Sequence, residues 1–167
     1  LFATIEPTIA GAHRAGIVLS GHTDVVPVDG QAWTTDPFKA TLKDDRIYAR
    51  GSADMKGYLG VVLGMTPRFI AAKRKAHFAL SYDEEVGCIG VRGLIEDLVR
   101  NDIKPAGCIV GEPTSMQVMI AHKGKRAFKC CVTGREAHSA LTPQGVNAIE
   151  YAARLIVYIR HIADRLR

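Results

Sequence analysis

Six side chains that can bind a metal or move a proton follow short apolar segments of the sequence. They are one imidazole and five carboxylates: His22, Asp24, Asp54, Glu84, Glu85 and Glu112. If they meet in one cleft, the carboxylates repel one another strongly unless a cation compensates their charge. Mixed histidine and carboxylate ligands suit zinc, cobalt or manganese, and the lack of cysteine at these points argues against a structural zinc site.

Two pairs within this set have spacings that suggest separate tasks. Asp24 lies two residues after His22, so both side chains share a face of extended backbone, and Asp24 can accept the second imidazole N–H and fix the tautomer. Of the adjacent Glu84 and Glu85, one carboxylate can bind metal while the other moves protons. A divalent metal lowers the pKa of water that it binds to about 7, and a free glutamate can take that proton. The residues alone leave open which glutamate does which.

Alternating strands and helices must position these side chains. Strands are expected at "AGIVLSG", Arg46–Ala49, "AHFALSYDEE" and "AGCIVGEP", with a turn at Lys43-Asp44-Asp45. Helical spacing runs from Met55 to about Lys73, with a break expected at Pro67, and again through "VRGLIEDLVRND". The order indicates an α/β sheet that is at least partly parallel, whose carboxyl-terminal edge would collect the polar residues.

The pattern changes after Pro113. "KRAFKCCVTG" alternates like a strand, and "GVNAIEYAARLIVYIRHIADRLR" has the spacing of a long amphipathic helix begun by Asn147. We expect a catalytic domain over residues 1–114 and the first part of a second domain over residues 115–167, both incomplete. The expected buried stripe of the long helix is Ile149, Ala152, Ala153, Ile156, Ile159 and Ala163.

Composition excludes several classes of protein. The formal charge of +5 comes from scattered basic residues with no aromatic-interleaved stripe, so a nucleic-acid partner is not expected. No apolar segment approaches the roughly 20 residues that span a bilayer, and "LFATIEPTIAG" does not resemble a signal peptide. The four cysteines show no CxxC spacing, which favours buried free thiols and a cytoplasmic location.

Five motifs in order resemble those of the zinc-dependent aminoacylase/carboxypeptidase family of amidohydrolases. They are "SGHTDVVP", "GSADMKG", "DEEVG", "GEPT" and "GREAHSALTPQGVNAIE", and they extend from Ile17 to about Ile159. The resemblance implies a zinc-peptidase-like mixed sheet covered by helices, followed by a ferredoxin-like α+β lid and dimerisation domain. It also implies two bound Zn²⁺ ions, with Co²⁺ or Mn²⁺ as possible substitutes, and a homodimer.

The same resemblance implies a role for each site residue. His22 and Glu112 would bind one zinc, Glu85 the second, and Asp54 would bridge both. Asp24 would orient His22, Glu84 would be the general acid/base, and His138 would reach the partner subunit's active site and help to hold the substrate carbonyl. A cis peptide can follow the bridging aspartate in this family. The other histidines and Lys56 are expected to be ordinary surface or packing residues.

The implied activity is hydrolysis of the amide bond of an N-acyl amino acid. "GEPT", "AHKGK" and "GVNAIE" are most similar to the members that convert N-acetyl-L-ornithine to L-ornithine and acetate in arginine biosynthesis. A succinyl-diaminopimelate desuccinylase and a metallocarboxypeptidase are the alternatives. The family's second zinc takes a further histidine beyond the length of this chain, so we expect a partial sequence. A different class of protein is therefore also possible, a truncated, inactive fragment that binds metal and dimerises.

Overall fold

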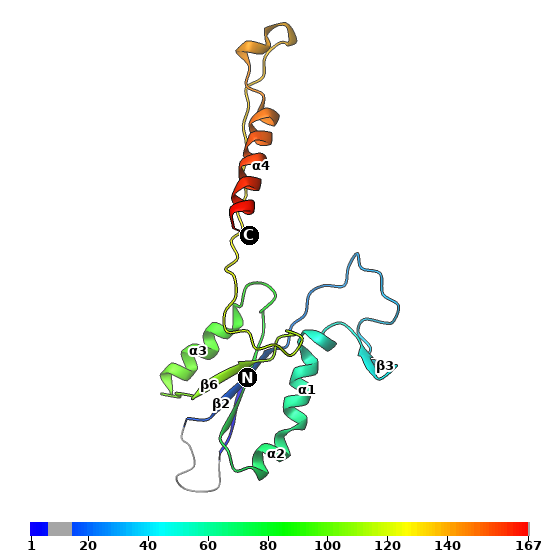
Figure 1. The fold of residues 1–167 in the computed structure, drawn as a ribbon, viewed down its shortest axis with the longest axis vertical. Helices are drawn as coiled ribbons and strands as arrows, with labels where there is room; N and C mark the ends of the chain where they lie inside the picture. Colours follow the sequence, from blue (N-terminus) through cyan, green and yellow to red (C-terminus); the bar gives the residue numbers. More distant parts are fainter. Residues whose placement is uncertain (7–14, 167) are drawn as a thin grey trace. The chain divides into compact units, whose positions relative to one another are not determined.

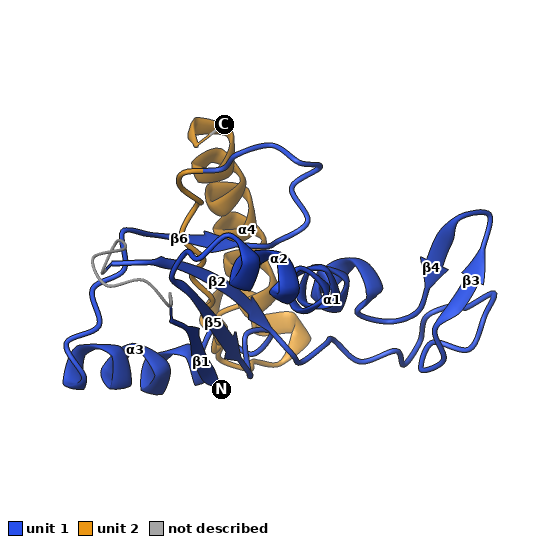
Figure 2. Cartoon of the chain, turned by 90° about the horizontal axis from the view of Figure 1, so that it is seen from below, with its two compact units in different colours: residues 1–119 blue, residues 120–167 orange. Residues whose placement is uncertain are grey.

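The computed structural model describes residues 1–6 and 15–166. The chain forms two compact units, Leu1–Met119 and Ile120–Arg167 (Figure 2). Whether these units correspond to a catalytic domain and a lid domain stays a prediction. No helix in the described part of the chain is both long and apolar enough to cross a membrane.

A four-stranded mixed sheet forms the centre of the first unit (Figure 1). Its order is β1-β5-β2-β6, and the strands are Phe2–Ile5 (β1), Ala76–Ser81 (β5), Ile17–His22 (β2) and Gly107–Val110 (β6). β2 pairs in parallel with both β5 and β6, whereas β1 pairs antiparallel with β5. The predicted mixed α/β sheet is therefore confirmed, and three parallel strands end at one edge.

Helices cover both faces of this sheet. They are α1 (Gly57–Gly64), α2 (Thr66–Ala71) and α3 (Gly90–Arg100). Because side chains alternate along a strand, Phe78 and Gly21 face α1 and α2: the Phe78 ring lies 6.2 Å from that of Phe69, and Gly21 packs closely on Leu59. α3 lies on the opposite side of the sheet in both views (Figures 1 and 2).

The predicted break in the first helical region is confirmed. α1 ends at Gly64 and α2 begins at Thr66, with Pro67 in the first turn of α2. A proline there loses no intrahelical hydrogen bond, because the first N–H groups of a helix have no partner within it. The predicted turn is also present: Asp44 and Asp45 have positive φ and join β3 (Thr41–Lys43) to β4 (Arg46–Tyr48).

The second unit contains a short irregular helix, Ser139–Gln144 (η2), and the long helix α4, Ala148–Arg165. The prediction that Asn147 begins the long helix is confirmed, because its Oδ1 accepts the N–H of Ile149 at 3.0 Å. Asn147 therefore acts as the N-cap of α4.

Three expectations were wrong. "KRAFKCCVTG" forms no strand, because no described segment pairs with it; only an isolated bridge, Arg135 to Val146, follows. The apolar stripe of α4 is not buried, with Ile149 78% and Ile156 66% exposed, because no other described element covers it. All four cysteines are free, as expected, but they are exposed rather than buried.

Candidate metal centre

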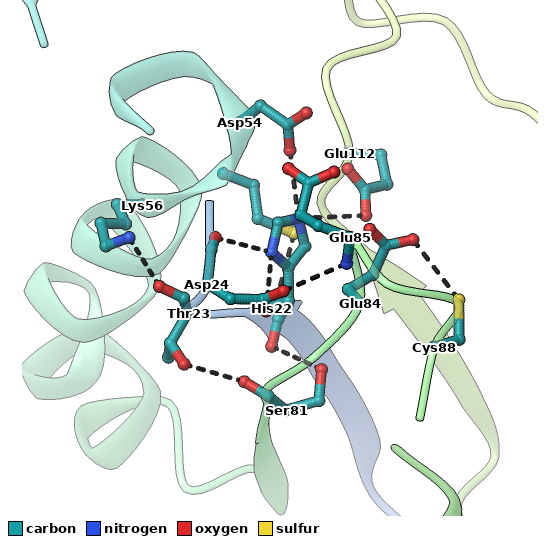
Figure 3. Close-up of polar contacts among 12 residues, drawn as sticks. His22, Thr23, Asp24, Asp54, Lys56, Ser81, Glu84, Glu85, Cys88 and Glu112 are labelled. Atoms are coloured by element: carbon teal, nitrogen blue, oxygen red, sulfur yellow. Dashed lines mark hydrogen bonds and ion pairs between the residues drawn. The ribbon is translucent and has the colours of Figure 1, made fainter. Parts of the chain in front are cut away.

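His22 is the last residue of β2 and lies at the centre of the carboxylate cluster (Figure 3). Its side chain is only 2% exposed, although it is a polar residue at the end of a strand. Nε2 lies 3.1 Å from Oδ1 of Asp54 and 3.9 Å from Oε1 of Glu112. The parallel register explains the meeting: β2 carries His22, and β6, which pairs with β2, ends two residues before Glu112.

The other ring nitrogen of His22 faces Asp24. Nδ1 lies 3.0 Å from the Asp24 backbone carbonyl and 3.3 Å from its carboxylate Oδ1. The sequence suggested the carboxylate as acceptor, and the structure adds the carbonyl of the same residue at a shorter distance. With Nδ1–H donated to Asp24, Nε2 keeps its lone pair and can bind a metal.

Local charges set the ionisation of this pair. Burial alone would lower the pKa of His22, but the hydrogen bond with Asp54 and the charges of Glu112 and Asp24 outweigh it, so the pKa is raised above 6.5. Burial alone would raise the pKa of Asp24, but backbone N–H groups, first that of Glu85, outweigh it and lower the pKa. The Glu85 N–H donates to Asp24 Oδ2 at 3.1 Å. Asp24 is therefore a firmly ionised carboxylate beside the imidazole.

Asp54 reaches the cluster from an irregular turn, Ser52–Lys56 (η1), that precedes α1. The backbone at Asp54 is extended (φ −121°, ψ 99°), and the Asp54–Met55 peptide bond is cis. The Lys56 N–H closes the turn on the Gly51 carbonyl at 2.8 Å. Met55 is fully buried, and its Sδ accepts the backbone N–H of His22 at 3.3 Å. The turn thus fixes the backbone of His22 as well as the carboxylate of Asp54.

Three glutamates complete the cluster. Glu84 and Glu85 lie in the turn after β5, and Glu112 follows β6. Burial, and then the neighbouring charge of Asp54, raise the pKa of Glu112, although His22 opposes the rise. The part of this rise that comes from neighbouring carboxylates is one that a bound cation would relieve.

The donor atoms have a spacing that suits a divalent metal. One ligand atom from each of His22, Asp54 and Glu112 can be chosen so that all lie within 4.8 Å of one another, and the same holds for His22, Glu84 and Glu85. Two atoms bound to one tetrahedral zinc lie roughly 3.4 Å apart, given bonds of about 2.1 Å. The residues therefore fit a metal, and the first group contains both predicted ligands of the first zinc together with the predicted bridge. How the ligands divide between two metals stays a prediction.

A cavity of about 170 Å³ adjoins the cluster. Its lining includes His22, Glu84, Cys88 and Glu112 from three different strand ends and the turn before α3. The cavity gives a small molecule access to the imidazole and to two of the carboxylates. The arrangement can therefore bind a cation and expose it to a substrate.

His138 lies in the second unit and is exposed there. Its Nδ1 accepts the N–H of Ala140 at 3.1 Å, so it caps the short helix η2. This contact gives His138 a local structural task that the sequence did not indicate. Its expected role in a partner subunit's active site stays a prediction.

Several residues that support the cluster were not foreseen. Lys56, expected to be ordinary, donates from Nζ to the Thr23 carbonyl at 2.6 Å. Tyr58 packs so closely on Gly111 that a Cβ there would lie 2.1 Å from the Tyr58 ring. The Cys88 thiol donates to Glu84. Only Gly111 left a signal in the sequence, because a glycine directly before a predicted ligand indicates a close backbone approach.

The sequence is similar to those of known proteins. The chain is 36% identical over 159 residues to a protein named acetylornithine deacetylase from Pasteurella multocida, which covers 94% of this chain and 41% of the relative. It is 37% identical over 160 residues to a protein of the same name from Proteus mirabilis, covering 94% and 40%. The chain thus spans about two-fifths of the length of the curated relatives that it matches.

The fold is similar to those of two solved structures. An M20 family metallo-carboxypeptidase from Sulfolobus solfataricus superposes with a TM-score of 0.56 at 30% identity, over 66% of this chain and 25% of that one. Human carnosine dipeptidase 1 superposes with a TM-score of 0.54 at 25% identity, over 65% and 24%. The model of peptidase family M20/M25/M40 matches residues 18–162. With most of its length matched and its site residues gathered at one sheet edge, the chain belongs to peptidase family M20/M25/M40.

Proposed function

We propose that this chain carries the metal-binding part of a hydrolase that cleaves the amide bond of an N-acyl amino acid. The observation that carries the proposal is the group of His22, Asp54 and Glu112, whose ligand atoms lie within 4.8 Å of one another, with His22 and Glu112 also lining a cavity. The names of the curated relatives favour N-acetyl-L-ornithine as substrate, with L-ornithine and acetate as products. Because the chain spans about two-fifths of those relatives, the proposal concerns the whole protein.

The proposed metals are two zinc ions, with cobalt or manganese as substitutes. His22 and Glu112 would hold one ion, Glu85 the second, and Asp54 would bridge them. When bound, such ions polarise the amide carbonyl and lower the pKa of a nearby water. Asp24 holds the His22 ring with Nε2 turned toward Asp54, so the imidazole needs no rotation to bind.

Glu84 is the proposed general acid/base, because its carboxylate lines the cavity beside His22 and Glu112. It takes a proton from the attacking water as the water oxygen bonds to the amide carbon. It then gives that proton to the amide nitrogen as the C–N bond breaks. The acyl group leaves as acetic acid, which carries the water oxygen and the second water proton; the acid then ionises to acetate and the amine of ornithine takes up that proton.

The full-length protein provides the test. We expect zinc-dependent release of L-ornithine from N-acetyl-L-ornithine, measured by chromatography of the amine, and loss of this activity in Glu84→Gln and after chelation. N-succinyl-diaminopimelate serves as the competing substrate. Turnover of the succinyl substrate alone would replace the proposed substrate but keep the chemistry, whereas full activity of Glu84→Gln would refute the assigned base.

A metallocarboxypeptidase is the second candidate, favoured by the likeness to the enzyme from Sulfolobus solfataricus. A metallocarboxypeptidase would release the C-terminal amino acid from an unacylated peptide, and a deacetylase would not cleave that peptide.

A cytoplasmic homodimer in which His138 completes the partner's site stays part of the proposal. Analytical ultracentrifugation tests the dimer, and an activity assay of His138→Ala tests the role of His138.

The remaining possibility is a non-enzymatic fragment. We expect that the 167-residue chain produced by itself binds at most one zinc tightly and hydrolyses none of these substrates. Elemental analysis of the dialysed chain gives the metal stoichiometry. Two tightly bound zinc ions, or full activity of this chain alone, would contradict the expectation.

A further inference from the structure

The Cys88 thiol forms a hydrogen bond with the carboxylate of Glu84. Sγ of Cys88 lies 3.4 Å from Oε1 of Glu84 (Figure 3). Both side chains line the cavity that His22 and Glu112 also line. Within residues 1–6 and 15–166, the thiol is the one group that donates a hydrogen bond to this carboxylate. No group in the described ranges donates to Oε2 of Glu84, so that oxygen is open to accept a proton from the attacking water.

The backbone of the turn after β5 holds the thiol in this position. The N–H groups of Gly87 and Cys88 both donate to the Glu84 carbonyl at 2.9 Å, and the Ile89 N–H donates to the Asp83 carbonyl at 3.0 Å. Cys88 has φ of 56°, a left-handed conformation that is uncommon outside glycine. This conformation turns the chain back, so that a side chain four residues after Glu84 points toward it.

The turn is also anchored where it enters α3. Gly90, the first residue of α3, approaches the Tyr82 carbonyl so closely that a Cβ there would lie 2.2 Å from the oxygen. Both ends of the turn are therefore tied to the end of β5. The backbone of the turn fixes the Cβ of Cys88, and χ1 alone then places its thiol, whereas the Glu84 side chain has three rotatable torsions.

We propose that Cys88 is a positioning residue, whose thiol holds the Glu84 carboxylate toward the cavity in one rotamer. The inference rests on the proposed role of Glu84 as general acid/base. A general base must lie within hydrogen-bond reach of the proton that it abstracts, so fixing its rotamer raises the rate of the chemical step. The thiol is a weak donor that orients the carboxylate. The pKa of this thiol is raised above its usual value, mainly by the hydrogen bond with Glu84, so the thiol remains a protonated donor.

Steady-state kinetics of the zinc-loaded full-length protein test the proposal. Cys88→Ala removes the donor, and we expect kcat to fall about 5- to 10-fold, the loss of one modest hydrogen bond, with KM unchanged. Cys88→Ser keeps a donor and should retain kcat within about twofold. Cys130→Ala, an exposed free thiol in the second unit, is the matched control and should behave as wild type. Wild-type kcat in Cys88→Ala, or equal loss in Cys88→Ser, would overturn the inference.

Alkylation gives a readout that does not depend on turnover. Iodoacetamide forms an S–C bond with the thiolate and releases iodide, and the charge of Glu84 should slow this reaction at Cys88. We expect Glu84→Gln to raise the alkylation rate of Cys88 several-fold at pH 8 and to leave that of Cys130 unchanged, measured by peptide mass spectrometry. Equal rates would show that the contact is absent, whether or not the protein hydrolyses any tested amide.

The two sets of measurements separate the two proposals. A wild-type protein that is inactive on every tested amide would contradict the proposed function, and the alkylation rates would then decide the Cys88 contact. An active wild type, an inactive Glu84→Gln and an unimpaired Cys88→Ala would contradict the positioning role alone.

Discussion

The imidazole Nε2 of His22 lies 3.1 Å from the carboxylate Oδ1 of Asp54, although 32 residues separate them in the sequence. The end of β2 supplies one group and the turn Ser52–Lys56 supplies the other. The contact joins a nearly buried nitrogen to a carboxylate that is 51% exposed. A metal that replaces this hydrogen bond would have one buried ligand and one ligand facing solvent.

Asp54→Asn tests that arrangement directly. Asparagine keeps the size of the side chain but removes its charge, so we expect zinc affinity to fall more than about 100-fold, beyond the range for residues that merely orient a ligand. Competition with a fluorescent chelator measures the dissociation constant. Asp36→Asn is the matched control, because the Asp36 carboxylate accepts a local backbone N–H from Phe38 in an exposed loop away from the cluster. Wild-type affinity in Asp54→Asn would remove Asp54 from the ligand set.

The burial of His77 leads us to expect that the free energy of unfolding of the metal-free protein depends on pH. The side chain is 1% exposed, its Nδ1 lies 2.8 Å from Thr4 Oγ1, and burial lowers its pKa below 6.5. The unfolded chain therefore takes up the proton first, so the contribution of His77 is present above about pH 6.5 and is lost as the pH falls through the folded-state pKa.

His77→Gln removes this titration while keeping a polar partner for Thr4. We expect the stability advantage of wild type over the variant, measured by urea unfolding, to shrink between pH 7.5 and pH 5.5. His161→Gln, on the exposed surface of α4, should give a constant difference from wild type. A constant difference for His77→Gln as well would mean that His77 does not titrate with folding.

The short apolar runs along the sequence predicted the sheet, because each parallel strand is such a run and pairs with the neighbouring strands. The same pattern predicted that polar residues would meet at one edge, since strand ends in a parallel sheet share an edge. The Cys88 contact with Glu84 could not be predicted in this way, because it depends on a left-handed residue in a turn. The strand expected at "KRAFKCCVTG" failed for a different reason: alternation indicates a strand only where a partner segment lies beside it.

We expect the hydrogen bond of Lys56 to strengthen zinc binding. Its Nζ donates to the Thr23 carbonyl at 2.6 Å, and this carbonyl lies between His22 and Asp24 in the chain. Lys56→Met keeps the apolar stem and removes the donor, so the loop loses one anchor and zinc affinity should fall about 10-fold, as for other groups that orient a ligand. Lys39→Met, in an exposed loop, is the control. Equal zinc affinities in the two variants, measured by chelator competition, would show that the Thr23 contact does not support the site.

Gly111 makes the approach of α1 to the end of β6 possible. A Cβ at this position would lie 2.1 Å from Tyr58 Cγ, and the Tyr58 hydroxyl donates to the Ile109 carbonyl at 3.3 Å. Gly111→Ala must therefore displace either the ring or the strand end that carries Glu112. We expect a loss of about 1–3 kcal/mol of stability, the usual cost of overpacking, together with weaker zinc binding.

Tyr58→Ala in the same chain tests whether the ring is the cause. It should return part of the stability lost in Gly111→Ala, so that a double-mutant cycle gives a coupling of at least about 0.5 kcal/mol. Gly60→Ala is the matched glycine control, since among the described residues no atom outside the adjoining backbone of α1 and its chain neighbours lies within 4 Å of its Cβ position, and alanine there should stabilise the helix by about 0.5–1 kcal/mol. Additive effects of Gly111→Ala and Tyr58→Ala would mean that the clash is relieved elsewhere, and that the ring does not position Glu112.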